Sequence, residues 1–175
     1  MTKRLVVLLR GINVSGHNKV PMAELRTALD ADGFENVATY IQSGNVAIDT
    51  AQEPRDVTAR VEELLAEHFD VHVPVVSIQQ VDVAGVLDAA PFDPDGNPAY
   101  QLIYFPGDPV DIDGVDAMDR TKYGNDIITA ATNAVYVAYD GGQSSSKLTL
   151  NALEKAAGTS LTGRNVRSVA TLIAL

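Results

Sequence analysis

Cysteine is absent from the 175-residue chain, so the protein can form no disulfide, no thiolate metal site and no cysteine nucleophile. No apolar run approaches the roughly 20 residues that a membrane-spanning helix needs. The run Leu5 to Leu9, followed at once by Arg10, is also too short for a signal-peptide core. These absences predict a cytoplasmic protein without a membrane segment.

Basic residues are scarce, and the formal net charge is −10. This charge argues against binding to nucleic acids or anionic membranes, because both partners attract basic surfaces. The few basic residues gather near the two ends of the chain, whereas the segment Asp82 to Asp126 is rich in aspartate. We interpret the acidic segment as a solvated surface. The basic ends coincide with the polar motifs described below.

The first half of the chain alternates apolar strand patterns with amphipathic helix patterns. Proline opens both helices, where its missing N–H group has no partner to lose. The element order is β-α-β-β-α-β, the split βαβ unit of ferredoxin-like folds. The expected elements are a strand from Lys3 to Arg10, a helix from Pro21 to Gly33, strands from Val37 to Ile41 and Asn45 to Asp49, a helix opening at Pro54, and a strand from Val71 to Ile78.

The second half repeats part of this order. It is expected to contain a strand at Tyr100, a hairpin at Ile127, a helix opening at Ser146 and a last helix opening at Arg164, with no closing strand. The sequence therefore predicts an α+β protein made of two ferredoxin-like halves. The expected organisation is a first half at residues 1–79, a helix and proline-rich linker at 80–99, and a second half at 100–175.

A polar loop follows the first strand and precedes the first helix. Gly11 and Gly16 permit tight turns, and helix N-termini attract anions. Arg10 and Lys19 flank the loop with positive charge. A true phosphate loop would carry lysine directly after the second glycine, but His17 stands there. The loop therefore predicts a weaker anion site.

The same loop has a purely structural interpretation. Asparagine side chains readily form hydrogen bonds with nearby backbone groups and tolerate left-handed conformations. Asn13 and Asn18 could therefore serve the loop's own backbone instead of a ligand. The sequence leaves both interpretations open.

The turn Gln42-Ser43-Gly44-Asn45 joins the second and third strands. In a split βαβ unit the first and third strands are neighbours, and this turn lies on the same edge of the sheet as the first loop. We therefore expect Gly11 and Asn45 to lie within about 10 Å of each other. The two motifs would then form one polar surface.

Two polar motifs stand in the second half. Ser146-Lys147 is interpreted as the serine-capped start of a helix. Arg164-Asn165 is either a ligand-binding arm or a tie between the last helix and the rest of the protein. His68 and His72 are four residues apart but have no evident third ligand, so no metal site is predicted.

The segments LLRGINVSGHNKVPMAEL and TYIQSGNVAI, the helix start at Ser146-Lys147, and the closing TGRNVRSVATL together resemble the bacterial family called domain of unknown function 1697. The resemblance covers nearly the whole chain. It implies two ferredoxin-like halves and no established activity. Val166 departs from the family, which usually has an aromatic residue after Arg-Asn, and His17 stands where the family often has a basic residue.

The leading hypothesis is a site for a small anionic ligand, such as a phosphorylated metabolite or nucleotide. The alternative is a module that binds a protein partner through the same loops. RNA binding is disfavoured, because the first and third strands lack the aromatic residues that stack bases. No cofactor is evident, and no nucleophile or general base stands out, so catalysis is left open. The candidate ligand-binding residues are Arg10, Gly11, Asn13, Gly16, Asn18, Lys19, Gln42, Ser43, Gly44, Asn45, Ser146, Lys147, Arg164 and Asn165.

Overall fold

The computed structural model describes all residues 1–175, and the chain divides into two compact units. The first unit comprises Met1–Ala84 together with Thr171–Leu175, and the second comprises Gly85–Ala170. The chain thus leaves the first unit once and returns to it for its last five residues.

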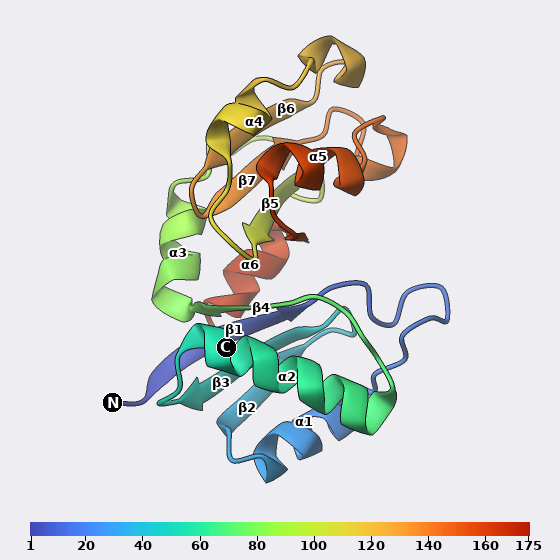
Figure 1. The fold of residues 1–175 in the computed structure, drawn as a ribbon. Coiled ribbons are helices and arrows are strands. Elements are labelled where there is room, and N and C mark those ends of the chain that lie inside the picture. Colours follow the sequence, from blue (N-terminus) through green and yellow to red (C-terminus); the bar gives the residue numbers. More distant parts are fainter. The chain divides into compact units, whose positions relative to one another are not determined.

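The first unit has the predicted β-α-β-β-α-β order, with a four-stranded antiparallel sheet in the order β2-β3-β1-β4 (Figure 1). This is the strand order of the split βαβ unit. Its elements are β1 (Lys3–Leu9), α1 (Met22–Ala31), β2 (Glu35–Tyr40), β3 (Asn45–Thr50), α2 (Pro54–Phe69) and β4 (Val75–Gln79), and α3 (Gln80–Asp88) continues into the second unit.

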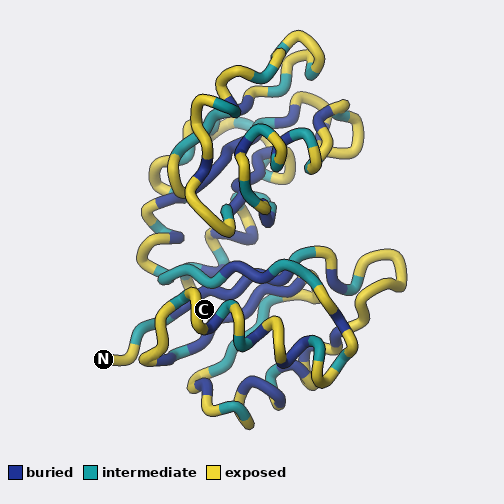
Figure 2. Tube along the Cα trace, viewed as in Figure 1, coloured by how far each residue is buried: buried dark blue, intermediate teal, exposed yellow.

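The core of the first unit lies between its sheet and the helices α1 and α2. β1 is central, and every residue from Leu5 to Leu9 is buried, which explains its uninterrupted apolar sequence. Alternate residues of β1 join the apolar faces of both helices in one cluster that includes Leu25 and Leu65. Figure 2 shows the central strands of this unit in dark blue and many exposed residues, in yellow, along its two helices.

The second unit repeats the arrangement, with an antiparallel sheet in the order β6-β7-β5-β8. The two halves are therefore similar, as the sequence predicts. The elements are β5 (Gln101–Pro106), α4 (Ile112–Asp116), a 3-10 helix (Arg120–Tyr123), β6 (Ile127–Ala131), β7 (Ala134–Ala138), a 3-10 helix (Gln143–Ser145), α5 (Leu150–Ala157), β8 (Leu161–Asn165) and α6 (Val166–Leu172).

The prediction that Arg164 opens the last helix is wrong, because residues 161–165 form the closing strand β8, which pairs antiparallel with β5. Gly163 allows β8 to lie close to Tyr104 of β5, because the Cβ of any other residue at this position would lie 2.6 Å from the Tyr104 ring. The helical spacing of Val166, Val169 and Leu172 belongs to α6, which begins directly after the strand.

The prediction that Ser146 opens and caps a helix is also wrong. α5 begins at Leu150, and the hydroxyl of Thr149 accepts a hydrogen bond from the backbone N–H of Ala152 (3.2 Å). Threonine satisfies a helix N-terminus in the same way as serine. No helix of the protein is long and apolar enough to cross a membrane.

Candidate functional site

The loop after β1 and the turn before β3 lie against each other. Leu8 pairs with Asn45 across the sheet, and the N–H of Leu9 donates to the carbonyl of Gly44 (2.9 Å). The side-chain amide of Asn13 donates to the carbonyl of Gln42 (2.8 Å). We call residues 10–20 and 41–45 together the loop–turn surface. The predicted neighbourhood of these two motifs is confirmed by these contacts.

Gly44 allows the turn to lie directly on β1. Its φ is +81°, and an added Cβ would lie 2.7 Å from the Cβ of Leu9 and 3.0 Å from the Leu9 carbonyl oxygen. No other residue type fits this space without a shift of the backbone. The glycine of the turn is therefore explained by packing alone.

The asparagines of the loop hold its own backbone together. The Asn13 amide donates to the Val20 carbonyl (2.9 Å) as well as to Gln42, and its oxygen accepts from the Val20 N–H (2.9 Å). Asn18 donates to the Gly11 carbonyl (2.9 Å). This arrangement is what the structural interpretation of the loop predicts. Asn13 uses both its amide and its oxygen to brace the loop, and Asn18 adds one further bond from its amide.

The turn is braced in the same manner. Asn45 is fully buried, and its amide donates to the Tyr40 carbonyl (3.1 Å) and to the Ser43 hydroxyl (2.9 Å). A buried amide is costly unless it is hydrogen-bonded. Asn45 therefore fixes the shape of the turn from within.

The loop–turn surface contains many residues in the left-handed region of φ. Most are glycine, asparagine or serine, for which the cost is small, but Ile41 has φ +49°. A β-branched residue is a real outlier there, and the cost is about 1–2 kcal/mol. The residues with positive φ are Gly11, Asn13, Ser15, Gly16, Asn18, Ile41 and Gly44.

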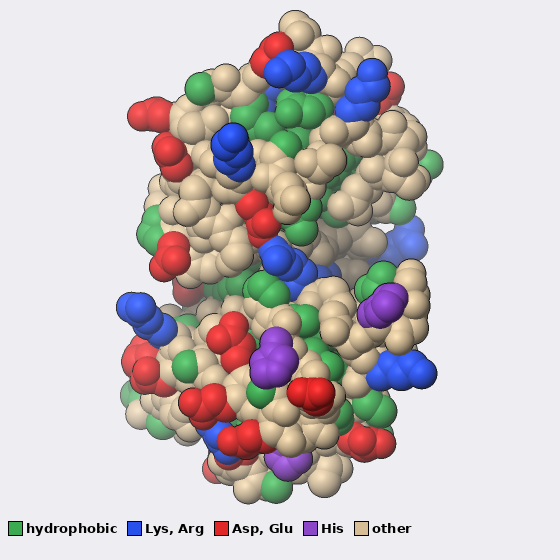
Figure 3. Space-filling model, turned by 45° about the vertical axis from the view of Figure 1, so that its right-hand side comes forward, with side chains coloured by type: hydrophobic (Ala, Val, Ile, Leu, Met, Phe, Trp, Pro, Cys, Tyr) green, Lys and Arg blue, Asp and Glu red, His purple; other side chains and the backbone are tan.

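The groups that the loop–turn surface presents to solvent are mixed. Val14 is 56% exposed and Ile41 is 51% exposed, which makes them two of the few exposed large apolar side chains of the protein. Lys19 and Gln42 are exposed beside them, and Arg10 is half-buried. The surface is thus apolar at its tips and basic at its flank, whereas acidic side chains are spread over the face of the protein in Figure 3.

The predicted residues of the second half lie in the second unit. The Ser146 hydroxyl forms a short hydrogen bond with a carboxylate oxygen of Asp126 and accepts one from the Leu148 N–H (2.9 Å). Lys147 is exposed and lines a polar depression with Lys122. Ser146 thus supports the local loop, and Lys147 is available to solvent.

Arg164 and Asn165 stand at the end of β8. The Asn165 side chain accepts from the Ser168 N–H (2.9 Å), which satisfies the start of α6. Arg164 is half-buried, and one of its nitrogens donates to the Gly163 carbonyl (2.8 Å). Loss of solvent lowers the pKa of Arg164 to about 10, so it stays charged at neutral pH. Asn165 thus joins the end of β8 to the start of α6, whereas the bond from Arg164 to Gly163 stays within the strand.

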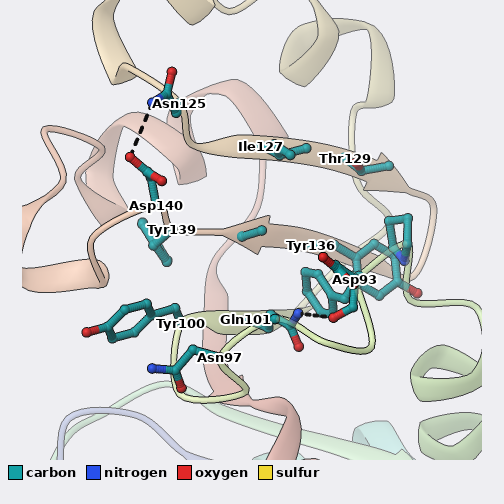
Figure 4. A pocket seen from close by; sticks show the side chains of 14 residues that line it. Asp93, Asn97, Tyr100, Gln101, Asn125, Ile127, Thr129, Tyr136, Tyr139 and Asp140 are labelled. Carbon is teal, nitrogen blue, oxygen red and sulfur yellow. Dashed lines mark hydrogen bonds between the residues drawn. The ribbon is translucent and has the colours of Figure 1, made fainter.

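The sequence interpretation missed a cavity of about 390 Å³ in the second unit, between the sheet and the segment 91–100 (Figure 4). The signal that pointed there was the long proline-containing loop, since such loops are often functional, followed by a series of tyrosines. Its lining residues are Pro91, Phe92, Asp93, Gly96, Asn97, Tyr100, Gln101, Asn125, Ile127, Thr129, Tyr136, Ala138, Tyr139 and Asp140.

The chain is similar to known proteins in its sequence over residues 1–136 and in its fold over nearly its whole length. A family model described as protein of unknown function (DUF1697) matches residues 1–136. The solved structure of a conserved bacterial protein from Streptococcus pneumoniae is 22% identical, covers 99% of this chain and 98% of its own, and superimposes with a TM-score of 0.74. At this identity the likeness concerns the fold. A search of curated proteins gave no significant match.

Proposed function

Because the chain belongs to the DUF1697 family, whose function is unknown, we infer its function from the loop–turn surface and propose that this surface binds a protein partner. The partner inserts between the exposed side chains of Val14 and Ile41. The module is expected to act in the cytoplasm, and the proposal requires no catalysis.

The observation that carries the proposal is the strained and exposed Ile41. Ile41 is 51% exposed, so it gains only part of the burial energy of an isoleucine, and asparagine or glycine would adopt its left-handed backbone at lower cost. Strain of this kind persists at sites where the strained residue serves a function. Val14, on the adjacent loop, is the second exposed apolar side chain.

The chemistry of the surface limits the partner. Exposed apolar side chains on rigid loops suit an apolar residue of the partner. Lys19 is exposed at the flank, within a protein whose net charge is −10. The fitting segment therefore combines an apolar side chain with a carboxylate. The hydrogen bonds of Asn13 and Asn18 support this proposal, because a pre-organised loop loses little entropy on binding.

Site-specific photo-crosslinking in the native host tests the proposal. A photoreactive residue at position 41 is compared with one at Val81, which is 72% exposed in the same unit but lies outside the loop–turn surface. We expect one discrete adduct from position 41 that is lost on Lys19→Glu and is absent from position 81. The same adducts from both positions, or none from position 41, would refute the proposal.

A second candidate function is the binding of a small anionic ligand at the same surface. The observation in its favour is that α1 begins after Pro21 without a side-chain cap, close to Lys19. Such helix starts attract anions. Thermal unfolding with a panel of nucleotides, sugar phosphates and carboxylates tests it, since a ligand at about 100 times its dissociation constant adds about 2.7 kcal/mol. If no compound of the panel gives a thermal shift that is lost on Lys19→Ala, this candidate is refuted.

A further inference from the structure

The cavity of the second unit lies between strand β6 and the segment 91–100, and each side contributes both apolar and polar side chains. Figure 4 shows Ile127 and Thr129 of β6 along one side. On the other side it shows Tyr100 and Asn97, which belong to the segment 91–100 before β5. Its volume of about 390 Å³ lies within the range of about 300–1,000 Å³ that small-molecule sites occupy. The cavity is therefore large enough to hold a small organic molecule.

The charge of the lining is negative only. Asp93 and Asp140 line the cavity, and no lysine, arginine or histidine does. Each carboxylate accepts one hydrogen bond from a neutral group, Asp93 from the Asp95 N–H (2.9 Å) and Asp140 from the Asn125 amide (3.2 Å). Neither forms an ion pair. A ligand that carries a positive charge would complement them, and an anion would be repelled.

Two of the four aromatic residues that line the cavity are fixed through their hydroxyl groups. Tyr136 donates to the Val86 carbonyl (2.9 Å), and its ring meets Phe92 edge to face at 5.9 Å. The Tyr139 hydroxyl is hydrogen-bonded to that of Tyr104 (2.6 Å). Tyr136 and Tyr139 are only 3% and 4% exposed, so they form a fixed, buried part of the wall. The more exposed rings of Phe92 and Tyr100 are left for contact with a ligand. Aromatic rings attract organic cations through their negative faces.

Tyr100 is an exposed part of this lining, since 38% of the residue is accessible to solvent. The ring rests on the backbone of Gly142, where an added Cβ would lie 2.9 Å from a ring carbon. This close seat holds the ring at the mouth of the cavity. Tyr100 can therefore cover one side of a bound molecule.

A neighbouring polar depression sets the orientation of a ligand. It shares Asn125 and Asp140 with the cavity and is lined by Lys122 and Lys147. These two cations repel a positive group on that side of Asp140. The favourable place for a ligand cation is therefore the aromatic side.

We propose that this cavity binds a small organic amine, in which an ammonium group meets Asp140 and an apolar or aromatic skeleton lies against Tyr100 and Phe92. This site is separate from the loop–turn surface and does not depend on the proposed partner. Phosphorylated and carboxylated metabolites are excluded from it by charge.

Three compounds of similar shape test the proposal on the intact protein: 2-phenylethylamine, 2-phenylethanol and 3-phenylpropionate, which are cationic, neutral and anionic at pH 7. We expect the amine to bind about tenfold more tightly than the alcohol, and the acid not to bind, as measured by NMR titration. Equal affinity of the amine and the alcohol, or no binding of the amine at millimolar concentration, would overturn the proposal.

Matched variants assign the contacts. Asp140→Asn should weaken the amine about tenfold and leave the alcohol unchanged, while Asp95→Asn, in the segment 91–100 but outside the lining, should change neither. Tyr100→Leu should weaken both compounds. Since Asp140 and Tyr100 are exposed, the fold should survive, and an unchanged melting temperature confirms it. An Asp140→Asn protein that binds the amine as before contradicts the assignment.

Discussion

Ile41 combines a strained backbone with an exposed side chain, so its removal should have opposite effects on stability and on binding. Ile41→Asn replaces it with a residue that tolerates the left-handed region, and we expect the free energy of unfolding to rise by about 1 kcal/mol. The melting temperature should then rise by about 2–4 °C. The variant should at the same time lose the partner.

The control for this prediction is Val14→Asn. Asn replaces an exposed apolar side chain without relieving strain at Ile41, so it should weaken partner binding without the gain in stability. A less stable Ile41→Asn protein would show that the isoleucine side chain supports the fold, and the functional interpretation of its strain would fail.

Gly44 and Gly11 both have positive φ but differ in the space around them. A Cβ at Gly44 meets backbone and side-chain atoms of Leu9, whereas a Cβ at Gly11 meets nothing within 4 Å. Gly44→Ala should therefore lower the free energy of unfolding by about 2–4 kcal/mol, through strain and overpacking together. Gly11→Ala should cost only about 1 kcal/mol, from its backbone alone. Equal losses in chemical denaturation would contradict this account.

At the scale of elements, the sequence predicted the strand and helix order of the first unit because its patterns are strong. β1 is an uninterrupted buried run, and α1 and α2 show apolar stripes. β8 could not be predicted in the same way. Its sequence LTGRN contains glycine and three polar residues, and its strand conformation depends on pairing with β5, which is distant along the chain.

The candidate site could likewise be predicted only in part from the sequence. The meeting of the loop and the turn followed from topology, because the split βαβ unit fixes which strand ends share an edge. The roles of individual side chains did not, since the hydrogen bonds of Asn13 and Asn18 depend on the exact path of the loop. The cavity of the second unit was missed because its residues come from three strands and three separate loop segments.

The contact between α1 and α2 makes the first unit sensitive to acid. Asp32, at the end of α1, accepts hydrogen bonds from Arg60 of α2, the shortest at 2.6 Å. These bonds hold the pKa of Asp32 below its ordinary value. The contribution is therefore fully present above about pH 4, the unfolded value, and is lost as the pH falls through the lower folded value.

We expect Asp32→Asn to be less stable than the native protein at pH 7, and the difference to shrink as the pH falls from 5 to 2. Denaturant unfolding at several pH values measures it. Asp30→Asn, an exposed aspartate two residues away, is the control and should show no such convergence. A difference that stays constant with pH would mean that Asp32 acts without its charge.

At the scale of the whole molecule, the return of residues 171–175 to the first unit makes that unit dependent on the end of the chain. Leu172 is fully buried, and its carbonyl accepts from the Gln80 side chain (2.9 Å). Leu172→Ala should lower the free energy of unfolding by about 2–5 kcal/mol. Leu175→Ala is the control. Leu175 is half-buried, and its backbone oxygen accepts hydrogen bonds from Arg4 and Gln80, which the substitution leaves in place. It should therefore lower the free energy of unfolding by less than about 1 kcal/mol.

The same return has a consequence in time. Gln80 and Leu172 are separated by 92 positions, and a ribosome adds about 5–20 residues per second. The sheet of the first unit is therefore synthesised about 5–20 seconds before the segment that completes it. The second unit is synthesised in this interval and ends directly before the returning segment, so the first unit stays incomplete until residues 171–175 have been made.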